Sequence, residues 1–262
     1  MPTAYDRVKI ARGAKRPTGA DYLSGVFTGF FELHGDRRYA DDPAILGGLA
    51  WLGGRPVTAI AIEKGHTAKE RIQRGFGAPQ PEGYRKALRL MRQAEKFRRP
   101  VVCFVDTSGA ACNVGAEERG EGQAIAECLT TMSTLKTPIV SVLIGEGGSG
   151  GALALAAGDR VWMLENAVYS VISPEGCATI LWKDAAKAEQ AAEQLKLTAP
   201  DALALGVVEQ IIPEAGLGTP EFYEKLAQSL LHELDTLAAK PDAELLAERY
   251  ARYRRFIPEV RL

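Results

Sequence analysis

The residues with the clearest chemical potential are the glycines of segment 145–151, which reads Gly-Glu-Gly-Gly-Ser-Gly-Gly. Five glycines in seven residues permit positive φ angles and let a ligand approach the main chain closely. The segment stands between a predicted strand and the start of a predicted helix, where free N–H groups favour negative charge. An oxyanion hole built from main-chain amides fits this pattern, and it needs no reactive side chain.

The same segment permits a dinucleotide-binding interpretation. Gly145, Gly147 and Gly150 satisfy the G-x-G-x-x-G pattern, and Glu165 follows the first of them by 20 residues, at a strand end. The helix after the segment is too short for an ordinary dinucleotide-binding unit, and the unit lies in the middle of the chain. Both points weigh against this interpretation.

A nucleophile elbow is a third interpretation, because Gly147, Ser149 and Gly151 satisfy G-x-S-x-G. Asp201 and His232 follow in the chain order that a serine hydrolase of this kind uses. His232, however, lies inside a predicted amphipathic helix with no other sign of a site around it. A tight packing turn that binds no ligand is the fourth interpretation.

The elements that must position this segment are predicted strand–turn–helix units. Apolar runs of strand length are predicted strands at 101–105, 139–144 and 161–164. Turn 107–109 follows the first of these strands, and a helix is predicted over 116–135. A short helix over 152–157 follows the glycine segment. Strands that are apolar on both faces predict a sheet covered by helices on both sides.

The first third of the chain has a different pattern. Segments 44–54 and 56–63 are predicted strands of a hairpin joined by Gly53-Gly54, and 82–97 is a strongly amphipathic helix. The order strand, strand, helix, strand, helix predicts an α/β fold built as a ββα spiral rather than a plain doubly wound sheet.

The two ends of the chain are predicted to be helical. The tail over 220–255 carries an apolar stripe that packs within the chain or against a partner. We find no linker rich in Gly, Pro or Ser, and therefore predict one domain over 1–262. It has an N-terminal extension over 1–30 and a C-terminal helical tail over 217–262.

The bulk composition narrows the class of protein. The 262 residues carry a formal net charge of −1, so no global field favours nucleic acid or an anionic membrane. We see no signal peptide and no apolar run near the roughly 20 residues of a membrane helix. Four scattered cysteines and three distant histidines make no zinc motif. We expect reduced thiols, no metal in this chain and a cytoplasmic location.

Seven segments together resemble the alpha subunit of the bacterial multi-subunit acetyl-CoA carboxylase carboxyltransferase. The resemblance extends from about residue 12 to about 213, and the order and spacing of the segments make it specific. The segments are His34–Arg37, Asp41–Ile45, Pro81–Ala87, Ala116–Gly120, Gly145–Gly151, Tyr169–Gly176 and Ile180–Asp184.

The resemblance implies a crotonase-like (ClpP/crotonase) fold and a biotin-dependent transferase. Such an enzyme moves the carboxyl group of carboxybiotin, held on a separate biotin carboxyl carrier protein, to acetyl-CoA and forms malonyl-CoA for fatty acid synthesis. It also implies a beta subunit that carries a four-cysteine zinc ribbon, and an α2β2 assembly. This chain lacks that cysteine set, which places it on the alpha, biotin-facing side.

The resemblance favours the oxyanion hole among the four interpretations. It implies that the amides of Gly147 and Gly148 stabilise the negative ureido oxygen left when carboxybiotin loses its carboxyl group, with Gly150 and Gly151 shaping the turn. The biotin anion then takes the methyl proton of the thioester, so no general-base side chain is required.

Further residues are predicted to line the substrates. Gly109 and Ala110 follow the neighbouring strand and are expected at the same sheet end, on the wall of the cavity. Tyr84, Arg85 and Lys86 are expected to position biotin or the phosphates of CoA, with an ordinary charged helix face as the alternative. Segment 117–119 and the pair Lys183 and Asp184 are expected to be structural or to lie at a subunit interface.

Two loops depart from the usual pattern of the family. Segment 108–113 reads Ser-Gly-Ala-Ala-Cys-Asn, without the aromatic residue and prolines that are common there, so a softer loop and a smaller pocket wall are expected. Glu63 and His66 replace an amide and a longer base. An altered acyl-CoA preference, or a non-catalytic assembly role of a related subunit, is therefore the alternative function.

Overall fold

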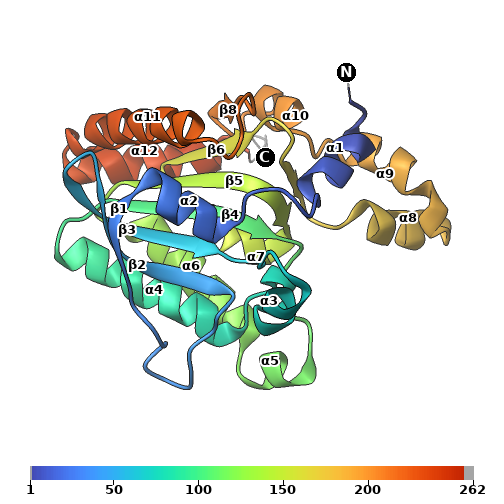
Figure 1. The fold of residues 1–262 in the computed structure, drawn as a ribbon, viewed down its shortest axis with the longest axis horizontal. Helices are drawn as coiled ribbons and strands as arrows, with labels where there is room; N and C mark the ends of the chain where they lie inside the picture. The colour runs from blue at the N-terminus through green and yellow to red at the C-terminus, as the bar shows by residue number, and fades with distance from the viewer. Residues whose placement is uncertain (1, 257–262) are drawn as a thin grey trace, which may run out of the picture.

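The computed structural model describes residues 2–256, and the fold is built on one mixed sheet (Figure 1). Within the described chain this sheet has eight strands, in the spatial order β1-β2-β3-β4-β5-β6-β8, and β7 pairs with the end of β5. In chain order they are β1 (Thr28–Glu32), β2 (Ile45–Leu52), β3 (Arg55–Ile62), β4 (Val101–Thr107), β5 (Ile139–Gly148), β6 (Arg160–Leu164), β7 (Val168–Ser170) and β8 (Gln210–Ile212).

The predicted hairpin is confirmed. β2 and β3 are antiparallel, and Gly53 and Gly54 both have positive φ, at 54° and 83°, as a two-residue hairpin turn of the favoured type requires. From β3 onward the neighbouring strands β3, β4, β5, β6 and β8 are all parallel. The carboxyl ends of β4 and β5, which precede turn 107–109 and the glycine segment, therefore meet at one edge.

The helices before β5 are those that the spiral needs. They are α1 (Ala4–Ala11), α2 (Gly19–Val26), α3 (Ala68–Gln73), the short η1 (Gly75–Gly77), α4 (Pro81–Lys96), α5 (Val114–Glu118) and α6 (Glu121–Thr134). The predicted single helix over 116–135 is wrong, because it is divided at Gly120, whose φ of 82° no α-helix accommodates. α4 begins with Pro81 in its first turn, where the missing N–H costs nothing, and lies beside α6.

The helices after β5 fall into a group that packs on the sheet and a group that projects from it (Figure 1). They are α7 (Ser149–Leu153), α8 (Pro174–Trp182), η2 (Ala185–Lys187), α9 (Ala188–Leu195), α10 (Ala199–Ala204), α11 (Pro220–Ala238) and α12 (Asp242–Arg254). The short helix predicted over 152–157 starts three residues earlier, at Ser149, and ends four residues earlier, at Leu153. The tail is two helices, separated by Pro241, and its predicted end over 257–262 lies outside the described residues.

The core lies between the sheet and these helices. The apolar stripe of α11, at Phe222, Leu226, Leu230, Leu234 and Leu237, is buried within this chain rather than left for a partner. Tyr22 of α2 is fully buried and packs against Phe104 of β4 with ring centroids 5.1 Å apart. The first 30 residues thus supply a helix of the core. No helix in the described part is long and apolar enough to cross a membrane.

Candidate active site at the end of β5

The glycine segment and the turn after β4 press against each other. A Cβ atom on Gly148 would stand directly against the carbonyl oxygen of Ser108 and 2.8 Å from the amide nitrogen of Gly109. A Cβ atom on Gly151 would stand 2.5 Å from the amide nitrogen of Ala110. Because these neighbours are main chain and cannot rotate away, only glycine fits at 148 and 151.

The positive φ angles expected at these glycines were wrong. None of the five glycines of this segment has positive φ, and the residue in the left-handed region is Ser149, with φ of 50°. Such a conformation costs a non-glycine residue free energy and is concentrated at functional sites. The glycines are required for close approach instead: a Cβ on Gly145 would strike the carboxylate of Asp106, whereas Gly150 has room, since Ile125 is 3.7 Å away.

The segment is also more regular than a turn. β5 continues to Gly148, and Gly147 and Gly148 pair with Tyr169 and Ser170 of β7. The helix α7 starts at Ser149, so its first N–H groups have no partner within the helix. The predicted strand 139–144 followed by a turn was thus too short, because glycine runs indicate turns even when a sheet ladder holds them extended.

Glycines of this segment line two cavities in the described part of the chain. Gly147 and Gly148 line one of about 40 Å³, together with side chains of Ser170 and Pro174. Gly150 lines the other, of about 300 Å³, in which Leu153 and Val171 supply apolar surface. The main chain proposed for catalysis therefore borders open space. The catalytic role of Gly147 and Gly148 stays a prediction.

Gly109 and Ala110 lie at the expected sheet end, beside Gly148 and Gly151, but the residue of this turn that lines the smaller cavity is Ser108. The Thr107 hydroxyl accepts from the Gly109 amide at 3.0 Å and donates to the Gly109 carbonyl at 2.8 Å. The Ala111 amide donates to the Pro79 carbonyl at 2.9 Å. These bonds hold the loop at Gly109 and Ala111, and the softness expected from the missing prolines stays a prediction.

Tyr84 reaches the site from α4. Its side chain is fully buried, and the hydroxyl donates to the carbonyl oxygen of Gly151 at 3.1 Å. Burial is the main cause that raises the pKa of Tyr84 well above its usual value, so the hydroxyl stays a donor. Tyr84 thus supports the glycine segment from behind, and it lines neither of the two cavities described above.

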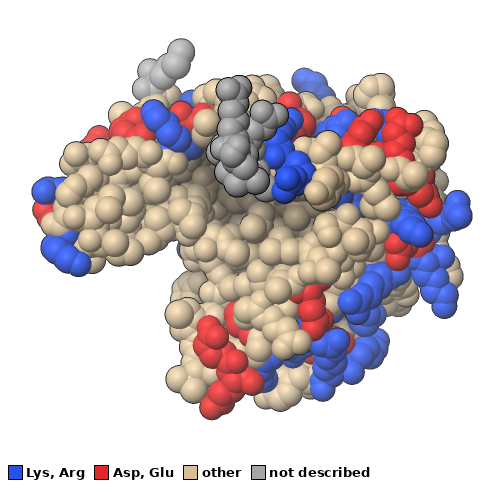
Figure 2. All heavy atoms as spheres, turned by 180° about the vertical axis from the view of Figure 1, so that it is seen from behind, with Lys and Arg blue, Asp and Glu red and all other residues tan. Residues whose placement is uncertain are grey.

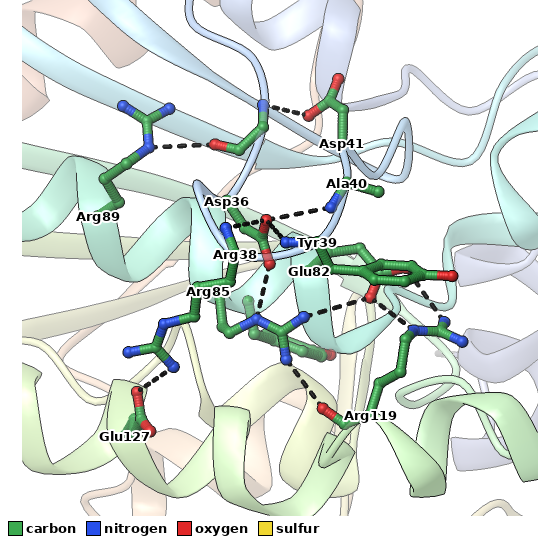
Figure 3. A network of polar contacts seen from close by, with 12 residues as sticks. Asp36, Arg38, Tyr39, Ala40, Asp41, Glu82, Arg85, Arg89, Arg119 and Glu127 are labelled. Carbon is green, nitrogen blue, oxygen red and sulfur yellow. Dashed lines mark hydrogen bonds and ion pairs between the residues drawn. The ribbon is translucent and has the colours of Figure 1, made fainter.

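Arg85 and Lys86 are both buried and have internal partners, and Figure 3 shows those of Arg85. Arg85 donates to the Asp36 carboxylate at 2.7 Å and to the Arg119 carbonyl at 2.9 Å. Lys86 is fully buried and pairs with Asp41 at 2.6 Å. Both ideas from the sequence, substrate contact and an exposed charged face, lack support, because these side chains bind loop 34–43 to α4.

Of the residues expected to be structural or to lie at an interface, Arg119 and Asp184 have internal partners. Glu117, Glu118 and Lys183 are exposed, and their interface role stays a prediction. Arg119 pairs with Glu82 of α4 at 3.1 Å, and Figure 3 shows it in the same network as Arg85. Asp184 caps η2 by accepting from the Ala186 amide at 3.0 Å. Glu63, one of the departures from the family pattern, is buried and accepts from the Ala20 and Gly65 amides, both at 2.6 Å.

Charged residues that sequence reasoning missed surround Glu146. Lys64 pairs with Asp106 at 2.6 Å and with Glu146 at 3.1 Å, and the Glu146 amide donates to Asp106 at 2.7 Å. Burial lowers the pKa of Lys64, but the two carboxylates outweigh it and the net shift is upward. Lys64 and Glu146 stood in segments that the sequence singled out, yet no local pattern shows that residues 82 positions apart pair.

The fold does not bring together the residues that a serine hydrolase site needs, and it lacks the long helix of a dinucleotide-binding unit after the glycine segment. Asp201 accepts a hydrogen bond from the Thr198 hydroxyl, at 2.6 Å, in the N-terminal cap of α10. His232 lies in the middle of α11, and neither residue borders the cavity that Ser149 lines. The helix after the glycine segment, α7, has five residues, which is too short to pack across a dinucleotide-binding unit.

Solved structures with the same fold are carboxyltransferases and related enzymes. Transcarboxylase 12S with hydrolysed methylmalonyl-coenzyme A bound has a TM-score of 0.70 at 22% identity, over 91% of this chain and 45% of that one. A Pseudomonas malonate decarboxylase hetero-tetramer in complex with coenzyme A has a TM-score of 0.68 at 18% identity, over 92% and 98%. At these identities the likenesses show the fold, and this chain shares the α/β fold of these proteins.

Sequence relatives are more specific. Residues 2–257 match the family described as acetyl co-enzyme A carboxylase carboxyltransferase-like. The acetyl-coenzyme A carboxylase carboxyl transferase subunit alpha of Ruminiclostridium cellulolyticum is 58% identical over 97% of both chains. The subunits beta/alpha protein of Natranaerobius thermophilus is 54% identical over 99% of this chain and 44% of its own. This chain belongs to the acetyl-CoA carboxylase carboxyltransferase alpha-subunit family.

Proposed function

We propose that this chain is the alpha subunit that, with a beta subunit, transfers the carboxyl group of carboxybiotin to acetyl-CoA and forms malonyl-CoA. One observation carries the proposal: the main chain of Gly147 and Gly148 borders a cavity at the joint end of two parallel strands, in a chain of this family. Relatives that cover nearly the whole chain bear this subunit name.

The chain's contribution to the reaction is electrostatic. Carboxybiotin supplies the carboxyl group and, after losing it, a ureido oxygen that carries negative charge. The amides of Gly147 and Gly148 are proposed to donate to that oxygen, and Gly109, Ala110, Gly150 and Gly151 to shape the space around it. Removal of one such donor typically lowers kcat by roughly 10²–10³-fold.

The main chain around the proposed donors is held in place by several contacts, which supports a role in stabilising charge. Tyr84 holds the Gly151 carbonyl, Asp106 holds the Glu146 amide, and the ladder to β7 holds Gly147 and Gly148. Donors that are already oriented need no rearrangement when charge develops, which is why preorganised amides stabilise transition states better than water does. No titratable side chain is assigned a proton-transfer step.

A beta subunit is the partner that the relatives indicate, since one of them joins beta and alpha in a single chain. Figure 2 shows, from behind, a projecting arm and a hollow beside it with few charged side chains, at the end where Figure 1 places α8. Several large apolar side chains at this end are exposed, namely Val114, Leu153, Val171, Ile180 and Leu181. We propose that the beta subunit covers this surface.

The finer assembly is also part of the proposal. We propose that biotin arrives on a separate carrier protein, that zinc belongs to the beta subunit, and that the complex is α2β2 and cytoplasmic. The four cysteines are unpaired in the described chain, as reducing surroundings would leave them. We treat residues 1–262 as one carboxyltransferase domain, because α2 and α11 both pack on its sheet.

The test uses the complex. The chain is purified with a beta-type subunit, and transfer of the carboxyl group from malonyl-CoA to a biotin derivative is followed. We expect turnover that requires both subunits and the biotin derivative. A complex that forms with a beta subunit of known competence but shows no turnover contradicts the proposal and favours a non-catalytic assembly role.

A further inference from the structure

Arg12 joins three elements that are far apart in sequence. It follows the last residue of α1, and its Nε donates to Glu146 of β5 at 2.7 Å. The same guanidinium donates to both carboxylate oxygens of Glu175, in the first turn of α8, at 2.8 and 3.3 Å. One planar group thus binds two carboxylates, a geometry that a lysine ammonium cannot reproduce.

Glu146 is the residue directly before the two proposed amide donors. Its carboxylate is held by Arg12 and Lys64 on its two oxygens, and its own amide is held by Asp106. Burial raises its pKa, but the charges of Lys64 and Arg12 outweigh burial and lower the pKa overall. The ionised Glu146 is therefore fixed through both its main chain and its side chain. Because Gly147 is the next residue, its amide is held in place as well.

Arg12 also borders the catalytic cavity itself. The cavity of about 40 Å³ is lined by Arg12 and Glu146 as well as by Gly147 and Gly148. The side chain of Arg12 is 36% exposed, and that of Glu146 is 12% exposed. Arg12 is thus close enough to the proposed donors for a change in its position to be felt there.

The second carboxylate that Arg12 contacts, Glu175, belongs to α8, a helix with few buried residues. α8 buries only Pro174 and Ala178 of its nine residues, and it leans on η2 and α9 rather than on the sheet. Tyr5 of α1 adds a hydrogen bond from its hydroxyl to Glu175 at 3.1 Å. The polar contacts of Glu175 are therefore a main link between α8 and the end of β5.

We propose that Arg12 is a positioning residue for carboxyl transfer: by clasping Glu175 and Glu146 together, it holds α8 against the end of β5 and fixes the main-chain amides of Gly147 and Gly148. This inference rests on the proposed function of those amides. It gives Arg12 an effect on kcat that exceeds its effect on substrate affinity, because Arg12 acts through Glu146.

The test is a double-mutant cycle with Arg12→Lys, Glu175→Gln and the two combined, each assembled with the beta subunit. The kcat and the KM for malonyl-CoA are measured with a biotin derivative as acceptor. We expect Arg12→Lys to lower kcat by about 10- to 100-fold, and Glu175→Gln by about 3- to 10-fold, with KM changed by less than about two-fold. We expect the double variant to match Arg12→Lys, since the second change removes a contact already lost.

Lys9→Gln is the matched control, one turn earlier on α1, where Lys9 pairs at 3.5 Å with the exposed Asp6. We expect this control to leave kcat unchanged. Glu175 is 35% exposed in its side chain, so its replacement by an isosteric amide leaves the fold intact even where Arg12→Lys lowers the melting temperature.

Three outcomes would overturn the proposal. They are a kcat of Arg12→Lys within about two-fold of the wild type, losses that multiply in the double variant, and a loss that resides wholly in KM or in assembly measured by sedimentation. An inactive wild-type complex is a different result, because it rejects the proposed function before the variants are compared.

Discussion

Gly151 and Ala110 approach so closely that a Cβ atom on Gly151 would lie 2.5 Å from the Ala110 amide nitrogen. This relationship joins the turn after β4 to the start of α7, which follows β5 directly, and the proposed site lies at this junction. Main chain against main chain leaves no side chain that can move aside. The contact therefore predicts a steep and specific response to the addition of one methyl group.

Gly151→Ala is expected to lower the free energy of unfolding by about 1–3 kcal/mol, as overpacking of a close contact does. Gly150→Ala is the matched control, because its Cβ would meet only Ile125 side-chain atoms at 3.7 and 3.8 Å. Within α7, that change gains up to about 1 kcal/mol from helix propensity. Urea unfolding of both variants measures the difference, and equal destabilisation of the two would contradict the packing account.

Tyr84→Phe is expected to lower the free energy of unfolding by about 1 kcal/mol, because it removes the hydrogen bond to the Gly151 carbonyl. Tyr22→Phe provides the comparison, since the buried Tyr22 hydroxyl has no partner among the described residues. Its removal is expected to be neutral or stabilising. Thermal unfolding of both variants tests the pair, and a larger loss for Tyr22→Phe would refute the assignment.

Glu121 predicts a pH dependence of stability. The pKa of Glu121 is raised to about 8 in the folded chain. Burial is the largest cause of this shift, followed by the carboxylates of Asp42 and Glu82. Neither carboxyl oxygen has a hydrogen-bond partner in the described chain. The folded protein thus holds this proton between the unfolded pKa of about 4.3 and about 8, and its stability falls as pH rises through that window.

Glu121→Gln removes the charge that the folded chain disfavours. We expect a melting temperature several degrees above the wild type at about pH 8.5 and a smaller gain at about pH 5, given that about 1 kcal/mol shifts the melting temperature by 2–4 °C in a chain of this size. The exposed neighbour Glu118, replaced by Gln, is the control. A gain that is equal at both pH values would show that desolvation of the carboxylate is not the cause.

Arg249 predicts a large loss of stability far from the site. Its side chain is 1% exposed and pairs with the buried Asp159 at 2.7 Å. It also donates to three main-chain carbonyls, those of Met132, Leu135 and Thr137. Arg249→Met leaves Asp159 as an uncompensated buried charge, which costs about 3–5 kcal/mol. Arg254→Ala, an exposed change on the same helix, is expected to stay within about 0.5 kcal/mol in urea unfolding.

The regular elements were largely predictable from the sequence. The hairpin at Gly53-Gly54 and the amphipathic helix before β4 carry strong local signals, and the structure confirms both. The break at Gly120 was missed, because a single glycine inside an apolar pattern is tolerated in helices as often as it ends them. The extension of β5 was missed because the ladder to β7 lies outside any local window.

The site was predictable only in part. The glycine segment and the turn at Gly109 and Ala110 are consecutive motifs, and parallel strands bring such motifs to one edge. Arg12 and Lys64 come from segments 134 and 82 residues away from Glu146, so only tertiary packing unites them. Charged residues on an amphipathic helix look exposed in a sequence, and Arg85 is buried because loop 34–43 folds over it.

The extended main chain of Gly147 and Gly148 limits how such an enzyme can evolve. A residue larger than glycine would meet Tyr169 at position 147 and Ser108 at position 148, so the amides that we propose as donors leave mutation almost no tolerated change. Selection for a new acyl-CoA must act instead on replaceable side chains that line the larger cavity, such as Leu153 and Val171, and on the beta subunit that we propose covers this surface.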